Sequence, residues 1–184
     1  MKKDSLITTD LLENVLESVY LKHEHPRLVD YEEAVAQLKN EKLEVIGCPY
    51  TKRSVHTSVH RSMKELVEKG DVIKEGKYYY GRLEYEDYCG KQDFRKYIYP
   101  ISYDFVPMSE NVVAIKLAQA ENHDAINHAV IRRLGEKKVY ASFICDNVLT
   151  IVFYKDAFDY DCCTDLVSAI SDAYRYNVLK EKNA

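Results

Sequence analysis

The chain has 184 residues and a net charge of −4, so it is long enough for two small domains that each bury a core without disulfides or metal. Its five cysteines are scattered and include no Cys-x-x-Cys pair, which predicts free thiols and a cytoplasmic location. No apolar run approaches the roughly 20 residues that span a bilayer, and the Met-Lys-Lys start is followed by a polar-periodic helix, so we exclude secretion and membrane insertion.

The first 50 residues predict two helices. Leucines and valines at spacings of three and four predict a helix that begins at Asp4 or Thr9 and continues to about residue 22. Pro26 follows its end. A second helix is predicted over residues 30–42, with Asp30 as its N-terminal cap.

Residues 51–82 predict a third helix and a short hairpin. The valine, methionine and leucine residues of the helix gather on one side, and Gly70 ends it. Val72 begins a strand, Glu75-Gly76 supplies a turn, and a tyrosine-rich strand returns over residues 77–82. Three helices and a hairpin within about 85 residues fit a winged helix-turn-helix.

Basic residues concentrate in this same segment. Residues 1–50 carry 6 basic and 10 acidic side chains, residues 51–82 carry 8 and 4, and residues 83–184 carry 12 and 16. A local cationic patch on an acidic body suits a protein that binds DNA through a limited number of phosphate contacts, although a solvated helix face would also explain these charges. The predicted contacts to DNA, in the major groove, at phosphate and at the hairpin, are Thr51, Lys52, Arg53, Ser54, Thr57, Ser58, Arg61, Lys74 and Lys77.

A domain boundary is predicted where residues 84–93 lack periodicity and concentrate acidic and turn-forming residues. The predicted domains are a winged helix-turn-helix over 1–86, a linker and edge strand over 87–109, and an α/β domain for oligomerisation or ligand sensing over 110–184. Pro100 restricts the strand predicted over 96–106 to an edge or a strand end.

The pattern after Asn111 is regular and predicts the order β-α-β-β-α. Strands are expected over 112–118, 139–144 and 148–154, and helices over 122–134 and 162–176. This order predicts a sheet covered on one side by two helices, and with the N-terminal half an α+β protein.

A winged helix followed by this second half resembles the arginine repressor family of bacterial transcription factors. The resemblance covers residues 10–83 and 110–176, and its second half is carried by ENVVAIKLA (110–118), HDAINHAVIRRL (123–134) and YASFICDNVLTIVF (140–153). It implies a small ferredoxin-like α/β sandwich that forms trimers or hexamers.

In that family a Gly-Asp-Asp turn holds the arginine co-repressor at a subunit interface. The corresponding residues here are Cys145, Asp146 and Asn147, so the glycine is absent and the second carboxylate is an amide. A buried guanidinium needs carboxylates to offset its lost hydration, and an amide contributes no charge. We therefore do not predict arginine as the effector, and we take Asp146 and Asn147 as candidate ligand-binding or subunit-contact residues.

No metal, cofactor or catalytic site is predicted. His56 and His60 share a helix face, but no third ligand joins them with suitable spacing, and polar contact with phosphate is the simpler interpretation. The chain has no Gly-x-Ser-x-Gly, phosphate-binding loop or His-Glu-x-x-His, and Cys162-Cys163 is read as packing, so we expect no enzyme.

The sequence thus predicts a DNA-binding transcriptional regulator, of repressor type by its resemblance, that binds double-stranded DNA as a homo-oligomer. Palindromic operators match two-fold symmetric proteins, so at least a dimer is expected, and a small-molecule effector is left open. The alternative is a protein-binding module, such as a phage-encoded inhibitor, in which the winged helix is a scaffold or autoregulator. The net charge of −4 and the 16 tyrosines favour that alternative.

Overall fold

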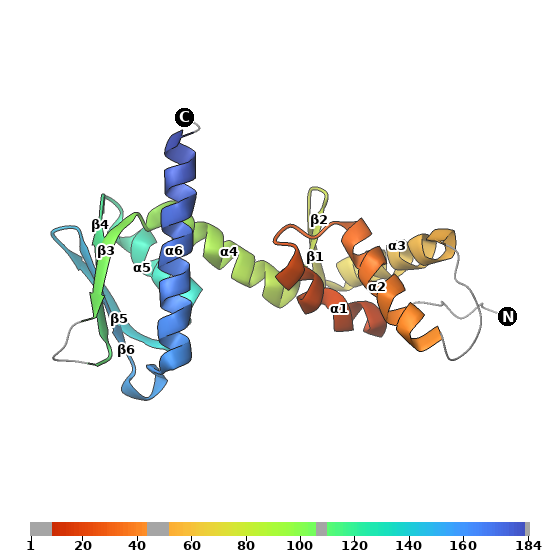
Figure 1. Ribbon diagram of the computed structural model, residues 1–184, viewed down its shortest axis with the longest axis horizontal. Helices are drawn as coiled ribbons and strands as arrows, with labels where there is room; N and C mark the ends of the chain where they lie inside the picture. The colour runs from red at the N-terminus through yellow and green to blue at the C-terminus, as the bar shows by residue number, and fades with distance from the viewer. Residues whose placement is uncertain (1–8, 44–51, 106–109, 183–184) are drawn as a thin grey trace. The chain divides into compact units, whose positions relative to one another are not determined.

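The chain has an α+β fold, shown by a computed structural model that describes residues 9–43, 52–105 and 110–182 (Figure 1). It divides into two compact units, Met1–Tyr88 and Cys89–Ala184. The first unit contains three helices and a β-hairpin, and the second contains a four-stranded antiparallel sheet packed with helices. None of the described helices combines the length and the apolar character needed to cross a membrane.

Three helices form the body of the first unit: α1 (Thr9–Lys22), α2 (Leu28–Leu43) and α3 (Lys52–Lys69). Each helix turns its apolar positions inward, as the helical spacing of these residues predicts. Gly70, with a φ of 85°, follows the last residue of α3 and ends it as expected. The shared core consists of Leu12, Val15, Leu16, Val19, Tyr31, Val35, Val55, Val59, Met63, Leu66 and Val72.

Helix α2 begins two residues earlier than predicted, at Leu28 rather than Asp30. The backbone N–H of Arg27 donates a hydrogen bond of 2.7 Å to Oδ2 of Asp30. Asp30 is therefore the third helical residue and reaches back to the residue before the helix, as the acid of a capping box does. The prediction of Asp30 as the cap was wrong in position, because the same side chain satisfies a free N–H from inside the first turn.

The hairpin pairs β1 (Val72–Glu75) with β2 (Tyr78–Gly81), and Gly76 takes a φ of 60° in its turn. The loop between α1 and α2 joins this hairpin. Arg27 forms an isolated antiparallel bridge with Tyr78, and the N–H of Tyr79 donates a 2.9 Å hydrogen bond to the carbonyl of Pro26. The hairpin is thus attached to the helices through its backbone, a contact that the sequence did not predict.

Residues 84–93 are helical, which corrects the expectation of an aperiodic boundary and of a linker starting at 87. Helix α4 (Arg82–Tyr97) follows β2 directly, and the boundary between the two units falls inside it. Gly90 lies in the middle of α4, where a Cβ would come within 3.2 Å of the Arg132 carbonyl oxygen. This glycine therefore permits close packing rather than a turn. The two halves of α4 pack in different cores, so no single helical stripe runs along it.

The second unit is built on a sheet with the strand order β3-β4-β6-β5, in which all neighbours are antiparallel. The predicted strands and helices are confirmed, except that the strand predicted over 96–106 begins only at Pro100, because Lys96 and Tyr97 form the end of α4. This strand, β3, lies at an edge of the sheet as expected. The last helix is longer than the predicted range of 162–176. The elements are β3 (Pro100–Phe105), β4 (Val112–Leu117), α5 (His123–Leu134), β5 (Val139–Cys145), β6 (Val148–Phe153), the 3₁₀ turn η1 (Lys155–Ala157) and α6 (Tyr160–Lys182).

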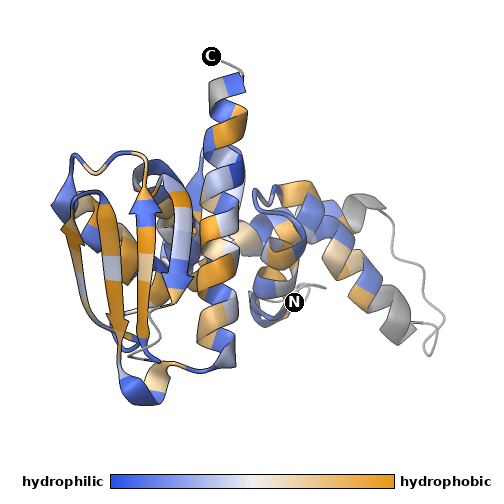
Figure 2. Ribbon diagram, turned by 60° about the vertical axis from the view of Figure 1, so that its left-hand side comes forward, coloured by the Kyte–Doolittle hydropathy of each residue, from blue (hydrophilic) through white to orange (hydrophobic). Residues whose placement is uncertain are grey.

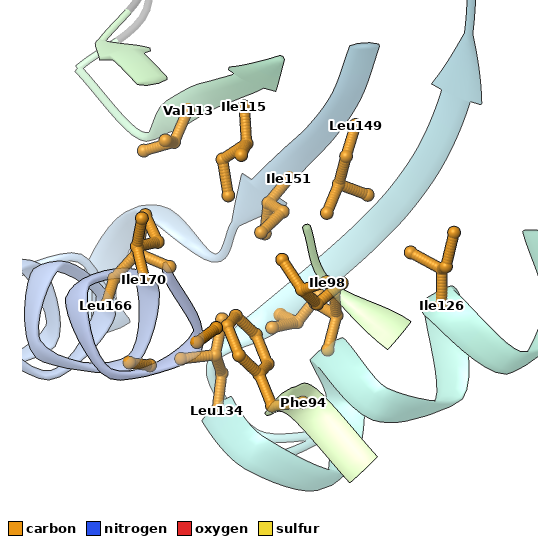
Figure 3. Close-up of a cluster of buried hydrophobic side chains, with 14 of the residues drawn as sticks. Phe94, Ile98, Val113, Ile115, Ile126, Leu134, Leu149, Ile151, Leu166 and Ile170 are labelled. Carbon is orange, nitrogen blue, oxygen red and sulfur yellow. The ribbon is translucent and has the colours of Figure 1, made fainter. Parts of the chain in front are cut away.

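Helices cover one face of this sheet and form a single core with it (Figure 3). The second half of α4 joins the two predicted helices, since Phe94 and Ile98 are buried in this core. Asn177 of α6 is also buried, and its Nδ2 donates to the carbonyls of Arg95, Ile98 and Ala173 at 3.3, 3.2 and 2.9 Å. The end of α4 is thus held to α6 by hydrogen bonds as well as by apolar packing.

Candidate functional site

The exposed side of α3 is the centre of the candidate site. Thr51 lies outside the described residues, and for Lys52, Arg53 and Ser54 only the helical backbone is described. Further along α3, Thr57 and Arg61 are exposed, whereas Ser58 is half-buried beside the core position Val59. The solvent face of the described part is formed by His56, Thr57, His60, Arg61, Lys64, Glu65 and Glu68.

Most charges on this face are compensated within the helix. Lys64 lies 3.7 Å from Glu68, and Lys69 lies 3.8 Å from Glu65, both as i,i+4 pairs. Among the described side chains, Arg61 has no carboxylate partner. Exposed i,i+4 ion pairs are weak, so a polyanion can compete with the glutamates for these lysines. Among the described cations of this face, Arg61 can bind an anion without first breaking an ion pair.

The two histidines of α3 have different surroundings. His56 Nδ1 lies 2.6 Å from Oε1 of Glu32, which belongs to α2. This contact links α2 to α3. A DNA phosphate would therefore have to compete with Glu32 for His56. His60 is exposed, and its ring lies 6.4 Å from that of His56. In the described part of the chain, no three His, Cys, Asp or Glu side chains gather closely enough to hold a metal ion.

The hairpin presents two lysines, each over a tyrosine ring. Lys74 Nζ lies 5.4 Å from the centre of the Tyr79 ring, and Lys77 Nζ lies 5.4 Å from that of Tyr78. Both lysines are exposed and both tyrosines are half-buried, so each ammonium group lies over one face of a ring and remains open to solvent. The hairpin thus presents two cations to solvent.

A groove of about 350 Å³ separates α3 from the hairpin. Its lining brings Lys74 together with residues of α3, but it includes neither Arg61 nor Lys77. Of the predicted contact residues that the structure describes, only Lys74 lines this groove together with residues of α3. Arg61 and Lys77 lie outside the groove. The groove is lined by Leu28, His60, Met63, Lys64, Val67, Glu68, Lys74 and Tyr79.

A cluster of aromatic residues packs around Tyr80 of the hairpin strand β2. Tyr80 stacks on Tyr88 of α4 with ring centres 5.0 Å apart, and its hydroxyl lies 3.1 Å from Nδ1 of His25. The Tyr31 hydroxyl donates a 2.7 Å hydrogen bond to the carbonyl of Tyr79. Burial raises the pKa of Tyr31 and Tyr80 above the ordinary tyrosine value, so both hydroxyls stay protonated and available for hydrogen bonding. These contacts attach the hairpin to the helices through side chains as well as through the backbone.

The second candidate site is the turn between β5 and β6. Asp146 and Asn147 are both exposed and have φ angles of 48° and 62°. They are the two central residues of a tight hairpin turn that is closed by the pair Cys145 and Val148. Cys145 precedes the positive-φ positions, so the missing glycine costs nothing in this turn. Asp and Asn tolerate the left-handed conformation, which explains both residues without any ligand.

The turn also packs against the neighbouring strand, because the Asn147 carbonyl accepts a 2.8 Å hydrogen bond from the N–H of Leu117. We expect Asn147→Val to lower the free energy of unfolding by about 1–2 kcal/mol, since a β-branched residue is strained at this φ. Asn147→Gly keeps the backbone conformation and is the matched control. Urea unfolding followed by circular dichroism checks this, and equal stabilities of the two variants would contradict it.

Two features of the site were missed by sequence reasoning. Arg27 lies beside the hairpin and adds a basic, exposed side chain, although Asp30 is 3.8 Å away. The sequence carried no signal for this position, because the bridge to Tyr78 joins a loop to a distant strand. Glu32 as the partner of His56 had no signal at all. Comparison of the chain with models of known protein families and with curated proteins gives no match.

Proposed function

We propose that the first unit is a winged helix-turn-helix and that the protein is a DNA-binding transcriptional regulator. The observation that supports this most is the combination of α3 with a hairpin that is hydrogen-bonded to the helical part and whose lysines are exposed. The isolated bridge from Arg27 to Tyr78 attaches the loop between α1 and α2 to that two-stranded hairpin, at the position where a winged helix can carry a third strand. The same segment is the net-positive part of an acidic chain.

In this proposal α3 enters the major groove of double-stranded DNA by its N-terminal turns. The candidate base and phosphate contacts there are Thr51, Lys52, Arg53, Ser54, Thr57 and Ser58. Arg61, one turn further on, is placed to reach a phosphate, and the hairpin lysines Lys74 and Lys77 contact backbone or minor groove. Phosphate contacts orient the protein, and the first turns of α3 read the bases.

The second unit is proposed to join subunits and to carry any effector site, with no chemical reaction. Its antiparallel sheet with helices on one face supports an α/β sandwich of the kind proposed from the resemblance to arginine repressors, but the order β-β-α-β-β-α ends on a helix and differs from the β-α-β-β-α-β order of a ferredoxin-like fold. Asp146 and Asn147 remain the proposed ligand or subunit contacts, and their exposure at the tip of a hairpin leaves both side chains accessible. A homo-oligomer places two reading units on one DNA duplex.

The test of this proposal replaces Lys52 and Arg53 together by alanine and measures binding to a duplex selected by the wild-type protein. We expect affinity to fall and the slope of log K against log salt to decrease by about two, one for each lost phosphate contact. Lys155→Ala, an exposed lysine of the second unit, is the matched control and should bind as the wild type does. Unchanged affinity and slope in the double variant would contradict the proposed reading helix.

A further inference from the structure

The sheet of the second unit has one face on which no described helix packs. Residues paired across strands lie on the same side of a sheet, and the buried Val113, Ile115 and Ile151 point toward the helices (Figure 3). The residues between them therefore point the other way. This open face consists of Ser102 and Asp104 of β3, Val112, Ala114 and Lys116 of β4, Val148, Thr150 and Val152 of β6, and Ala141, Phe143 and Cys145 of β5.

The open face is unusually apolar for a surface in contact with water. An antiparallel sheet with one solvated face alternates apolar and polar residues, but β4 reads VVAIKL and β6 reads VLTIVF. The strands of the sheet are accordingly coloured mainly as hydrophobic in Figure 2. Phe143 is 52% exposed on this face. Apart from Lys116 and Thr150, the two central strands thus have the apolar composition of strands that are buried on both sides.

The edges of the sheet do not offer an equivalent contact. β3 and β5 are the edge strands, and each contains a shift of register, between Pro100 and Ser102 in β3 and between Val139 and Ala141 in β5. Such irregularities, together with a proline at the start of β3, disfavour the addition of a strand from another chain. Association is therefore directed to the face of the sheet.

The charges of the open face are self-complementary. Asp104 and Lys116 are its charged residues, they lie on neighbouring strands, and within the described part of the chain neither has an ion-pair partner. A two-fold axis brings the same patch of two subunits together, so an attraction between Lys116 of one copy and Asp104 of the other is formed twice. A strongly charged partner would gain nothing from a face that carries one charge of each sign.

We propose that the open face packs against the open face of a second copy of this chain, as two aligned sheets about 10 Å apart. Phe143, on the edge strand β5, supplies a large exposed apolar contact, and the two pairs of Asp104 and Lys116 set the register. Tyr140 and Tyr154, whose ring centres are 5.3 Å apart and which are 67% and 46% exposed, extend the contact at one end of the sheet. This inference rests on the proposed oligomerisation role of the second unit and does not require DNA binding.

The first experiment measures the mass of the full chain by sedimentation equilibrium. We expect the wild type to have twice the chain mass of 21.4 kDa, and Phe143→Lys to weaken dimerisation by about tenfold or more. Tyr174→Lys, at a 55% exposed tyrosine of α6 outside this face, is the matched control and should leave the dimer intact. Thermal unfolding by circular dichroism verifies that each variant is folded.

The second experiment exchanges the charges. Asp104→Lys and Lys116→Asp should each weaken the dimer by about two- to fivefold, and the double variant should recover wild-type affinity because the pairs are restored in reverse. A wild type that stays monomeric up to about 100 µM, a mass other than two chains, or a dimer unaffected by Phe143→Lys would overturn the proposal. A dimer that binds no duplex would instead leave it standing and contradict the proposed function.

Discussion

Phe94→Ala is expected to lower the free energy of unfolding of the second unit by about 3–5 kcal/mol. Phe94 is 1% exposed and lies with Ile98 and Leu134 among the core residues shown in Figure 3. Truncation to alanine removes buried apolar surface and leaves a cavity that the helices and the sheet cannot fill without moving. Phe94, which the sequence placed in a predicted linker, is thus expected to contribute to the free energy of unfolding as a core residue does.

Hydrogen exchange measured by mass spectrometry is the suitable measurement, because it reports on peptides of β4 and β6 separately from the first unit. We expect the slowest-exchanging amides of these strands to lose protection in Phe94→Ala. Leu83→Ala is the control, since Leu83 lies on the same helix but is 76% exposed, and its effect should stay within about 0.5 kcal/mol. Equal protection in both variants would show that α4 is not part of this core.

Arg61→Glu combined with Lys74→Glu is expected to weaken duplex binding by about 10- to 100-fold at low salt. Each reversal removes a cation that has no carboxylate partner among the described residues and places a negative charge near phosphate. The loss should shrink as salt rises, because screening weakens both the lost attraction and the new repulsion.

Fluorescence anisotropy with a labelled duplex, repeated at several salt concentrations, measures this effect. Lys137→Glu with Lys155→Glu is the matched control, because it changes the net charge equally at exposed lysines of the second unit. Equal losses in the two double variants would show that total charge governs binding, and the proposed surface on α3 and the hairpin would be wrong.

Regular periodicity explains which parts of the fold could be predicted. α3 packs in one core and the β5–β6 hairpin in the other, so each sequence has one regular apolar pattern, of helical period in α3 and alternating in the strands. Their limits were therefore predicted within a few residues. α4 could not be found in this way, because its first half packs tyrosines beside the hairpin and its second half packs Phe94 beside the sheet. Gly90 added a false turn signal, since its role is to admit the Arg132 carbonyl.

The candidate site was predictable in its residue types but not in its pairings. The exposed positions of α3 follow from its apolar stripe, so Thr57 and Arg61 could be placed at the surface from spacing alone. The contact of His56 with Glu32 joins two helices, and the bridge of Arg27 to the hairpin joins a loop to a strand. Contacts of this kind depend on how elements pack, which no local pattern encodes.

The most direct test of DNA binding is the enrichment of random duplexes on the 184-residue chain, followed by titration of the enriched duplex at several salt concentrations. The proposed function predicts enrichment of one sequence, palindromic if the regulator is two-fold symmetric, with an affinity that falls linearly as log salt rises. The same duplex should bind less tightly to the Lys52→Ala, Arg53→Ala double variant. Failure to enrich any duplex, with no salt-sensitive affinity, would contradict the proposal that this chain is a DNA-binding regulator.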